Sequence, residues 1–175
     1  LHDAFNSISS DLDNHPQVVM KRYFLSDATN QSEMVERFEQ DNHCAVSIIQ
    51  QPPLDGSKIA LWAYFVSDID TQPATLGTST FFKHGKYTHL WTGSVSNEEK
   101  DSYAQTEFIF KRYIKQLREM GMTLEADCTR TWFFVSDIDN RYSGMVKARN
   151  EAFDACGLTC ENHFIASTGI CGFQK

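Results

Sequence analysis

The segment TWFFVSDIDN, residues 131–140, decides the fold that we predict for this chain, because a strand turns into a helix within it. Aromatic and β-branched residues lead up to Val135 and are typical of a strand. Ser136 and Asp137 follow, and their short polar side chains favour turns and helix caps. Apolar residues then recur at helical spacing from Tyr142 onward. We therefore predict a strand over 127–135 and a helix over 142–155.

The hexapeptide FVSDID occurs twice, at residues 65–70 and 134–139, and it raises the question of an internal repeat. The second copy joins a predicted strand to a helix. The first copy enters residues 68–77, an aperiodic segment containing Pro that is the best linker candidate. The meaningful counterpart of 131–137 is RYFLSD at 22–27, which also ends a strand before a helix. We interpret the chain as two related halves and the literal identity as coincidence.

Periodicity elsewhere predicts a partial first domain over residues 1–70 and a second domain over residues 76–175. The predicted helix caps are Asn30, with Glu33 completing a capping box, and Asn97. The predicted elements of the first domain are helices over 4–14 and 31–41, a strand over 17–25, and a hairpin of strands over 44–50 and 58–66. The further elements of the second domain are strands over 78–82, 87–95 and 163–168 and a long helix between Asn97 and Gly121.

Charge and composition argue against two classes of partner. The 175 residues carry a net charge of −7 and no run of more than two basic residues, so we expect no nucleic-acid partner. No apolar run approaches the ~20 residues that a membrane span requires, so we expect no membrane partner. The polar N-terminus does not resemble a signal peptide, which favours a cytoplasmic protein. Because the chain begins at Leu1 without Met, we expect a piece of a longer protein.

The cysteines do not predict a disulfide framework or a metal site. Their number, five, is odd, and no CxxC pair occurs, which favours reduced thiols. Cys156 and Cys160 lie near His163, but a structural zinc site needs four ligands at close spacing and a second pair is missing. We therefore predict no metal and no cofactor.

From Gly85 onward, the order of motifs resembles the Rid family, also called YjgF-like. Family members show a strand ending in Ser/Thr-Gly, a helix with an Ala-Gln-Thr motif, and a strand ending in Val-x-Asp. This chain has Thr92-Gly93, Ala104-Gln105-Thr106 and Val135-Ser136-Asp137 at those places, and the resemblance covers about residues 78–170. It implies an α+β fold, with a mixed β-sheet and two helices packed on one face. One near-complete copy, lacking its last strand, would follow a partial copy.

A narrower likeness is to the chorismatases, a branch with tandem Rid-like domains. Thr131-Trp132, Arg141-Tyr142 and Arg149 resemble the pattern of that branch. The likeness implies a further Rid-like domain beyond Lys175, and it adds a chorismate-like compound to the ligands that we consider.

Rid proteins are typically trimers with clefts between subunits, and many hydrolyse enamine or imine intermediates to a keto acid and ammonia. In that chemistry an arginine on the penultimate strand holds the substrate carboxylate through a bidentate fork. The aligned position here is His163, and a neutral imidazole cannot supply that contact.

The resemblance therefore leaves alternatives open. The chain binds or hydrolyses a small carboxylate metabolite at a rebuilt interface cleft, or it is a non-catalytic assembly domain of a longer tandem protein. A third alternative, RNA cleavage or inhibition of translation, follows an old family label and conflicts with the acidic charge.

The candidate ligand-binding residues are either at the family's cleft positions or are cations placed among aromatic residues. Alternating aromatic residues on one strand could line a cleft or be covered by another subunit, and Arg149 could extend its charge to the surface. Ser167 and His163 would lie ~13 Å apart on one strand face, too far for a nucleophile–base pair. The candidates are Tyr87, His89, Trp91, Thr92, Arg130, Trp132, Arg149 and His163, and the sequence assigns a catalytic role to none of them.

Overall fold

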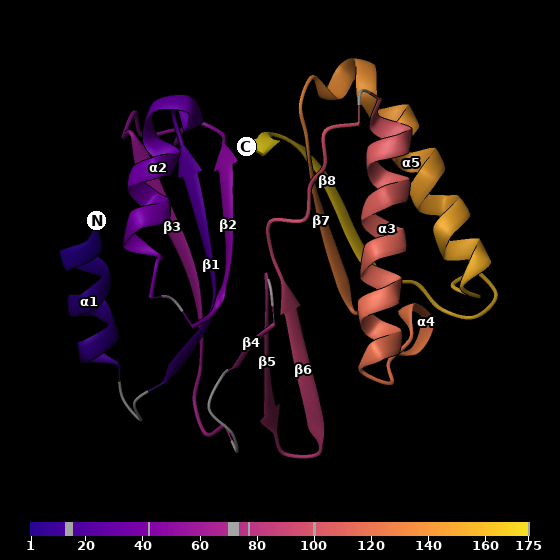
Figure 1. The fold of residues 1–175 in the computed structure, drawn as a ribbon, viewed down its shortest axis with the longest axis horizontal. Coiled ribbons are helices and arrows are strands. Elements are labelled where there is room, and N and C mark those ends of the chain that lie inside the picture. Colours follow the sequence, from indigo (N-terminus) through magenta and orange to yellow (C-terminus); the bar gives the residue numbers. More distant parts are fainter. Residues whose placement is uncertain (13–15, 42, 70–73, 77, 100, 175) are drawn as a thin grey trace. The chain divides into compact units, whose positions relative to one another are not determined.

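The structure is a computed structural model that describes residues 1–12, 16–41, 43–69, 74–76, 78–99 and 101–174. Within these ranges the chain is an α+β protein (Figure 1). It divides into two compact units, Leu1–Val95 together with Gln174, and Ser96–Phe173. The sequence placed the boundary within 68–77, whereas the structure keeps the strands that follow this segment in the first unit. Residues 70–73 and 77 of the segment lie outside the described residues.

Strand β1 (Gln17–Leu25) is central in the main sheet of the first unit, whose order is β3-β1-β2-β9. It pairs in parallel with β2 (Ala45–Gln50) and antiparallel with β3 (Ile59–Val66), and β9 (Phe173–Gln174) lies beyond β2. The predicted hairpin of β2 and β3 is therefore wrong. The apolar β1 inserts between these strands, because it is the strand that is buried on both faces.

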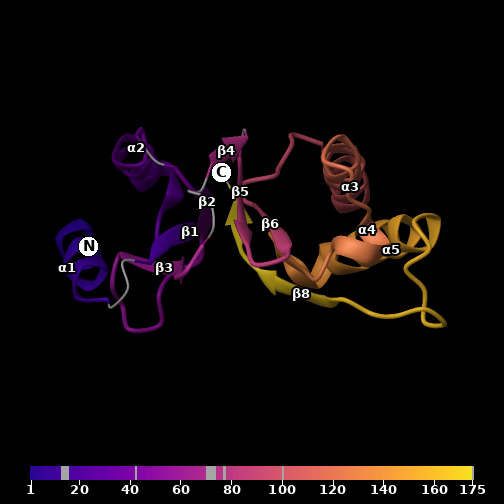
Figure 2. The same ribbon diagram turned by 90° about the horizontal axis from the view of Figure 1, so that it is seen from below.

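Helices α1 (His2–Asp11) and α2 (Ala28–Phe38) lie on the same side of this sheet (Figure 2). Tyr23 and Leu25 of β1 are buried against Val35 of α2. The sequence predicted Asn30 as the cap of this helix, but α2 begins earlier, because the side chain of Asp27 accepts a hydrogen bond from the Asn30 N–H.

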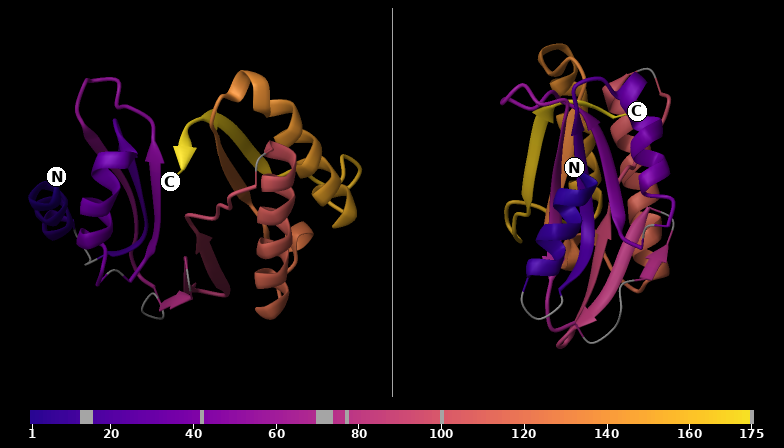
Figure 3. Two further views of the ribbon diagram at one scale, coloured as in Figure 1. Left: turned by 45° about the horizontal axis from the view of Figure 1, so that its top comes forward. Right: turned by 90° about the vertical axis from the view of Figure 1, so that its left-hand side faces the viewer.

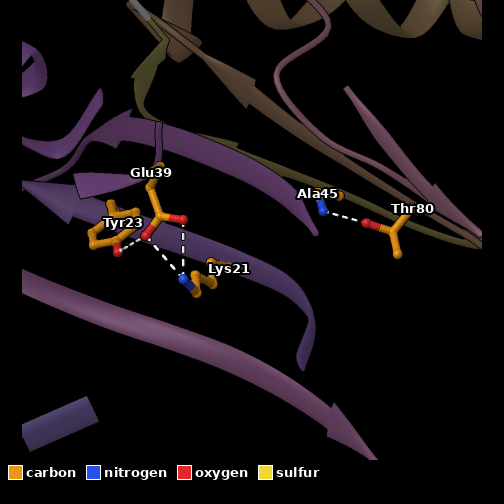
Figure 4. Close-up of polar contacts among 5 residues, drawn as sticks. All are labelled: Lys21, Tyr23, Glu39, Ala45 and Thr80. Atoms are coloured by element: carbon orange, nitrogen blue, oxygen red, sulfur yellow. Dashed lines mark hydrogen bonds and ion pairs between the residues drawn. The ribbon is translucent and has the colours of Figure 1, made fainter. Parts of the chain in front are cut away.

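A buried ionic cluster ties the end of α2 to β1 (Figure 4). Lys21 Nζ lies 3.0 Å from each carboxylate oxygen of Glu39, and the Tyr23 hydroxyl donates to the same carboxylate. Burial, together with this carboxylate, raises the pKa of Tyr23 far above its usual value. Lys21 also lies 4.8 Å from the ring centroid of Phe5 in α1, so the cluster joins both helices to the sheet.

A second sheet of the first unit contains β4 (Ala74–Leu76), β5 (Ser79–His84) and β6 (Tyr87–Thr92) in antiparallel order. Gly85 has a φ of 58° and turns the chain between β5 and β6, as the sequence predicted. The backbone N–H of Ala45 in β2 donates to the Thr80 hydroxyl of β5, which holds the hairpin beside the main sheet (Figure 4).

The second unit contains helices α3 (Ser102–Glu119), α4 (Leu124–Asp127) and α5 (Ile138–Ala155) and strands β7 (Arg130–Val135) and β8 (Ala166–Cys171). The two strands are parallel, and α3 and α5 lie side by side on one face of them (Figure 3). Gly144 makes this contact possible, because a Cβ there would lie 2.4 Å from Ser102 Oγ. No helix in the described ranges is both long and apolar enough to cross a membrane.

Several boundaries of the second unit differ from the sequence prediction, among them the start of α5, which is Ile138 and not Tyr142. Helix α3 begins after Asp101, which accepts from the Ala104 N–H, rather than after Asn97. The strand predicted over 127–135 starts later, because Thr123 caps the single turn of α4. The strand predicted over 163–168 is β8, which begins at Ala166.

The junction between β1 and α2 resembles the junction between β7 and α5. In each, an Asn side chain donates to the carboxylate of the Asp three positions earlier, Asn30 to Asp27 and Asn140 to Asp137. In addition, a side chain from the first turn of each helix donates a hydrogen bond to the Ser that precedes the Asp. Gln31 donates to Ser26, and Arg141 donates to Ser136. The predicted correspondence of these two segments therefore extends to their hydrogen bonds.

The two FVSDID copies share a backbone feature at their first Asp, but only the second copy continues directly into a helix. Each copy ends a strand at its Val, and the Asp that follows is left-handed, with φ of 56° at Asp68 and 50° at Asp137. Asp tolerates this region better than most residues. The shared sequence therefore encodes one way of ending a strand.

Candidate functional site

The four candidates of the first unit lie on β6 and are not equivalent. The ring of His89 stacks on buried Phe82 at 4.9 Å, with 2° between the planes. Thr92 Oγ1 lies 2.8 Å from the hydroxyl of Ser79. Tyr87 is 61% exposed, whereas Trp91 lies against Tyr64 of β3 at 4.7 Å between ring centroids.

Of the four candidates in the second unit, only Arg130 and Trp132 come together. The Arg130 guanidinium lies 4.5 Å from the Trp132 ring and donates to Thr168 Oγ1 at 3.2 Å. Arg149 on α5 instead donates to the side chain of its neighbour Asn150, at 3.2 and 2.9 Å.

The structure places His163 in the loop before β8, not on the predicted strand. Its Nε2 lies 2.6 Å from the backbone oxygen of Glu125, so the ring ties this loop to α4. Its neighbour Asn162 donates to the Gly157 carbonyl at 2.7 Å and strengthens the same loop. These contacts give His163 a structural role.

A distinctive polar arrangement lies on the face of the main sheet opposite α1 and α2 and centres on Arg22. This residue is only 7% exposed, although it is a cation on a strand face that it shares with Met20 and Phe24. The register places it between Ser47 on β2 and Trp62 on β3, and all three side chains share one face. The guanidinium carbon lies 5.5 Å from the Trp62 ring centroid, within range of a cation–π interaction.

A row of aromatic rings extends from Arg22. Trp62 and Tyr64 have ring centroids 5.9 Å apart, and Trp91 continues the row beyond Tyr64. The Trp62 and Tyr64 side chains are 38% and 42% exposed, unlike the arginine beside them. We call Arg22, Ser47, Trp62, Tyr64 and Trp91 the Arg22 cluster.

The turn after β6 closes on the same part of β2. A Cβ at Gly93 would lie 2.5 Å from the Val46 carbonyl oxygen and 3.1 Å from Ser47 Oγ, so only glycine fits. Ser94 adopts a left-handed φ of 47°, its hydroxyl donates to the Val46 carbonyl at 2.8 Å, and its N–H donates to Ser47 Oγ at 3.4 Å. The Thr-Gly motif singled out in the sequence therefore positions this turn against the cluster.

The cluster combines the groups that bind a planar organic anion. A guanidinium presents donors in a rigid fork that matches a carboxylate, and aromatic faces accommodate a flat apolar body. No group of three or more His, Cys, Asp or Glu side chains suited to a metal ion occurs among the described residues.

Reasoning from the sequence missed Arg22, although a usable signal existed. Arg22 alternates with Met20 and Phe24 on one strand face, which is the pattern that drew attention to Arg130. Ser47, Trp62 and Tyr64 could not be found in the same way. Their proximity to Arg22 depends on β1 lying between β2 and β3, and the sequence suggested a β2–β3 hairpin instead.

Comparison with known proteins gave no match to a family model, to a curated protein or to a solved structure. The α+β class rests on the structure. Membership of the Rid family stays a prediction from the motifs.

Proposed function

We propose that this protein binds a small planar carboxylate at the Arg22 cluster. The observation that carries the proposal is an arginine residue only 7% exposed, in register with a buried serine, with its guanidinium over an indole ring. Arginine presents its donors in a rigid planar fork that matches a carboxylate, so a ligand carboxylate could bind this guanidinium with good geometry.

The aromatic rings of the Arg22 cluster indicate what the rest of the ligand, beyond its carboxylate, looks like. Trp62 and Tyr64 each expose more than a third of their surface, so a flat conjugated body could cover them. Such stacking contributes about 0.5–1.5 kcal/mol per ring pair beyond the burial of area. The proposed ligand is therefore conjugated, as an enamine, an imine or a chorismate-like compound is.

This proposal moves the carboxylate contact of the Rid resemblance to a new position. Arg22 on β1 would supply the fork that His163 cannot, because His163 is held in a loop by Glu125. Hydrolysis of the bound compound is the stronger form of the proposal and rests on the resemblance alone.

A non-catalytic assembly role is the alternative, and it would use the same residues. The exposed rings of Trp62 and Tyr64 suit a protein surface as well as a ligand. A trimer, or pairing with a further Rid-like domain, would then cover them. Sedimentation of the protein with and without ligand separates the two roles. An assembly held together by these rings sediments with the mass of several chains, whereas a ligand-binding role alone leaves the sedimentation mass unchanged.

Binding should be measured by calorimetry with benzoate, chorismate and freshly generated 2-aminoacrylate. We expect saturable binding of at least one, a loss of at least about 30-fold in Arg22→Gln, and a loss of about tenfold in Arg22→Lys, which keeps the charge but not the fork. Arg37→Gln is the matched control, because Arg37 is a 74% exposed side chain of the same unit that pairs with Glu33 on its own helix.

Two results would count against the proposal. The first is the absence of saturable binding of all three compounds by the wild-type chain. The second is equal affinity in Arg22→Gln, Arg37→Gln and the wild type, with melting temperatures showing that each variant is folded.

A further inference from the structure

The hydroxyl of Ser47 has a defined direction. Ser47 is 6% exposed and lies next to Arg22 across the β1–β2 register. A serine hydroxyl carries one donor and two acceptor positions. Ser47 Oγ accepts from the Ser94 N–H, whereas no side chain or carbonyl among the described residues accepts the Ser47 proton. A buried donor without an acceptor costs free energy, so a ligand that accepts from it is stabilised.

The turn that orients this hydroxyl is held by close packing against β2 and by hydrogen bonds. Gly93 lies so close to β2 that a Cβ would collide with the Val46 carbonyl. The Gly93 N–H donates to the Thr78 carbonyl at 3.0 Å, and the Ser94 hydroxyl donates to Val46. Ser94 also keeps a left-handed backbone that is uncommon outside glycine, and such conformations concentrate at functional sites.

We propose that Ser47 is a ligand-binding residue that donates its proton to one oxygen of the carboxylate bound by Arg22. This inference rests on the proposed function and adds a second donor to it. The guanidinium and the hydroxyl project from neighbouring strands onto the same face, so they can bind the two oxygens of one carboxylate. Ser94 contributes only by orienting Ser47, through its N–H.

The test is a titration of the ¹⁵N-labelled protein with benzoate, followed by amide shifts. We expect the Ser94 amide to shift on binding, because its acceptor then donates to the ligand. Ser47→Ala should weaken benzoate binding about tenfold, as loss of a hydrogen bond to a charged group predicts, and should reduce the Ser94 shift. Ser47→Cys, which keeps the volume with a weaker donor, should behave similarly.

Ser32→Ala is the matched control, because Ser32 is a fully buried serine on α2, the helix on the other side of the sheet. It should leave the benzoate affinity unchanged. If Arg22→Gln abolishes binding but Ser47→Ala and Ser47→Cys retain the wild-type affinity, the role of Ser47 is overturned and the Arg22 proposal stands. If the wild-type protein binds none of benzoate, chorismate and 2-aminoacrylate, both proposals are overturned.

Discussion

Two adjacent cations on β1 have opposite environments. Lys21 points toward α2 and pairs with Glu39, whereas Arg22 points to the opposite face of the sheet and lies over Trp62. The alternation of a strand places them on opposite faces. One position therefore supports the fold, and the adjacent one is where we propose that a ligand binds.

Replacing Glu39 with Gln should lower the free energy of unfolding by about 3 kcal/mol, because it leaves Lys21 as a buried charge without a carboxylate. The Lys21 and Glu39 side chains are only 13% and 9% exposed. Urea unfolding measures the loss. Glu33→Gln is the control, since its pair with Arg37 is solvent-exposed and should matter little. Equal effects of the two substitutions would contradict the structural role of the Lys21 cluster.

The sequence contains enough information to find Arg22 but not its partners. A charged residue between apolar ones on a strand face is visible in the alternation of Met20, Arg22 and Phe24. The proximity of Trp91 to Tyr64 is a contact between two sheets, and no local pattern encodes it. The predicted group on β6 therefore contained one true member of the cluster, Trp91.

Among the elements, the two Ser-Asp junctions show one sequence motif used in two ways. Asp27 has an extended backbone and caps α2 through its side chain. Asp137 is left-handed and makes no side-chain cap bond to the backbone of α5. Each Asp accepts a hydrogen bond from the side chain of the Asn three positions later. The two junctions therefore share this Asp–Asn hydrogen bond, but they do not share the helix cap.

These junctions should respond differently to mutation. Asp27→Ala should lower the melting temperature by roughly 2–4 °C, because an N-cap acceptor is lost. Asp137→Gly should leave the melting temperature unchanged or raise it, because glycine adopts a left-handed backbone without strain. Differential scanning fluorimetry measures both, and a larger loss in Asp137→Gly than in Asp27→Ala would contradict this account.

Secondary structure was more predictable than strand pairing. The strand predicted over 17–25 matches β1, because its β-rich run ends at a clear Ser-Asp turn. Pairing depends on which strand is buried on both faces, which is a property of the assembled sheet. The sequence prediction placed the N-caps of α2 and α3 at a nearby Asn instead of at Asp27 and Asp101, because Asn is an equally good N-cap residue.

For the whole molecule, the structure and the sequence place the main boundary differently. The sequence boundary between the compact units falls after Val95, shortly before exposed Glu98 and Glu99, whereas the sequence prediction favoured residues 68–77. A glutamate-specific protease should therefore cut first after Glu98 or Glu99, because exposed segments between units are cleaved most readily. Mass spectrometry of the early fragments checks this. First cleavage within a helix of either unit would contradict the division.

The central claim is that Arg22 anchors the carboxylate of a small planar ligand, and a crystal structure with 4-bromobenzoate tests it most directly. The anomalous signal of bromine locates the ligand independently of its shape. We predict the carboxylate within hydrogen-bonding distance of Arg22 and Ser47 and the bromophenyl ring against Trp62 or Tyr64. A fully occupied ligand elsewhere, with the Arg22 cluster unchanged, would contradict the claim.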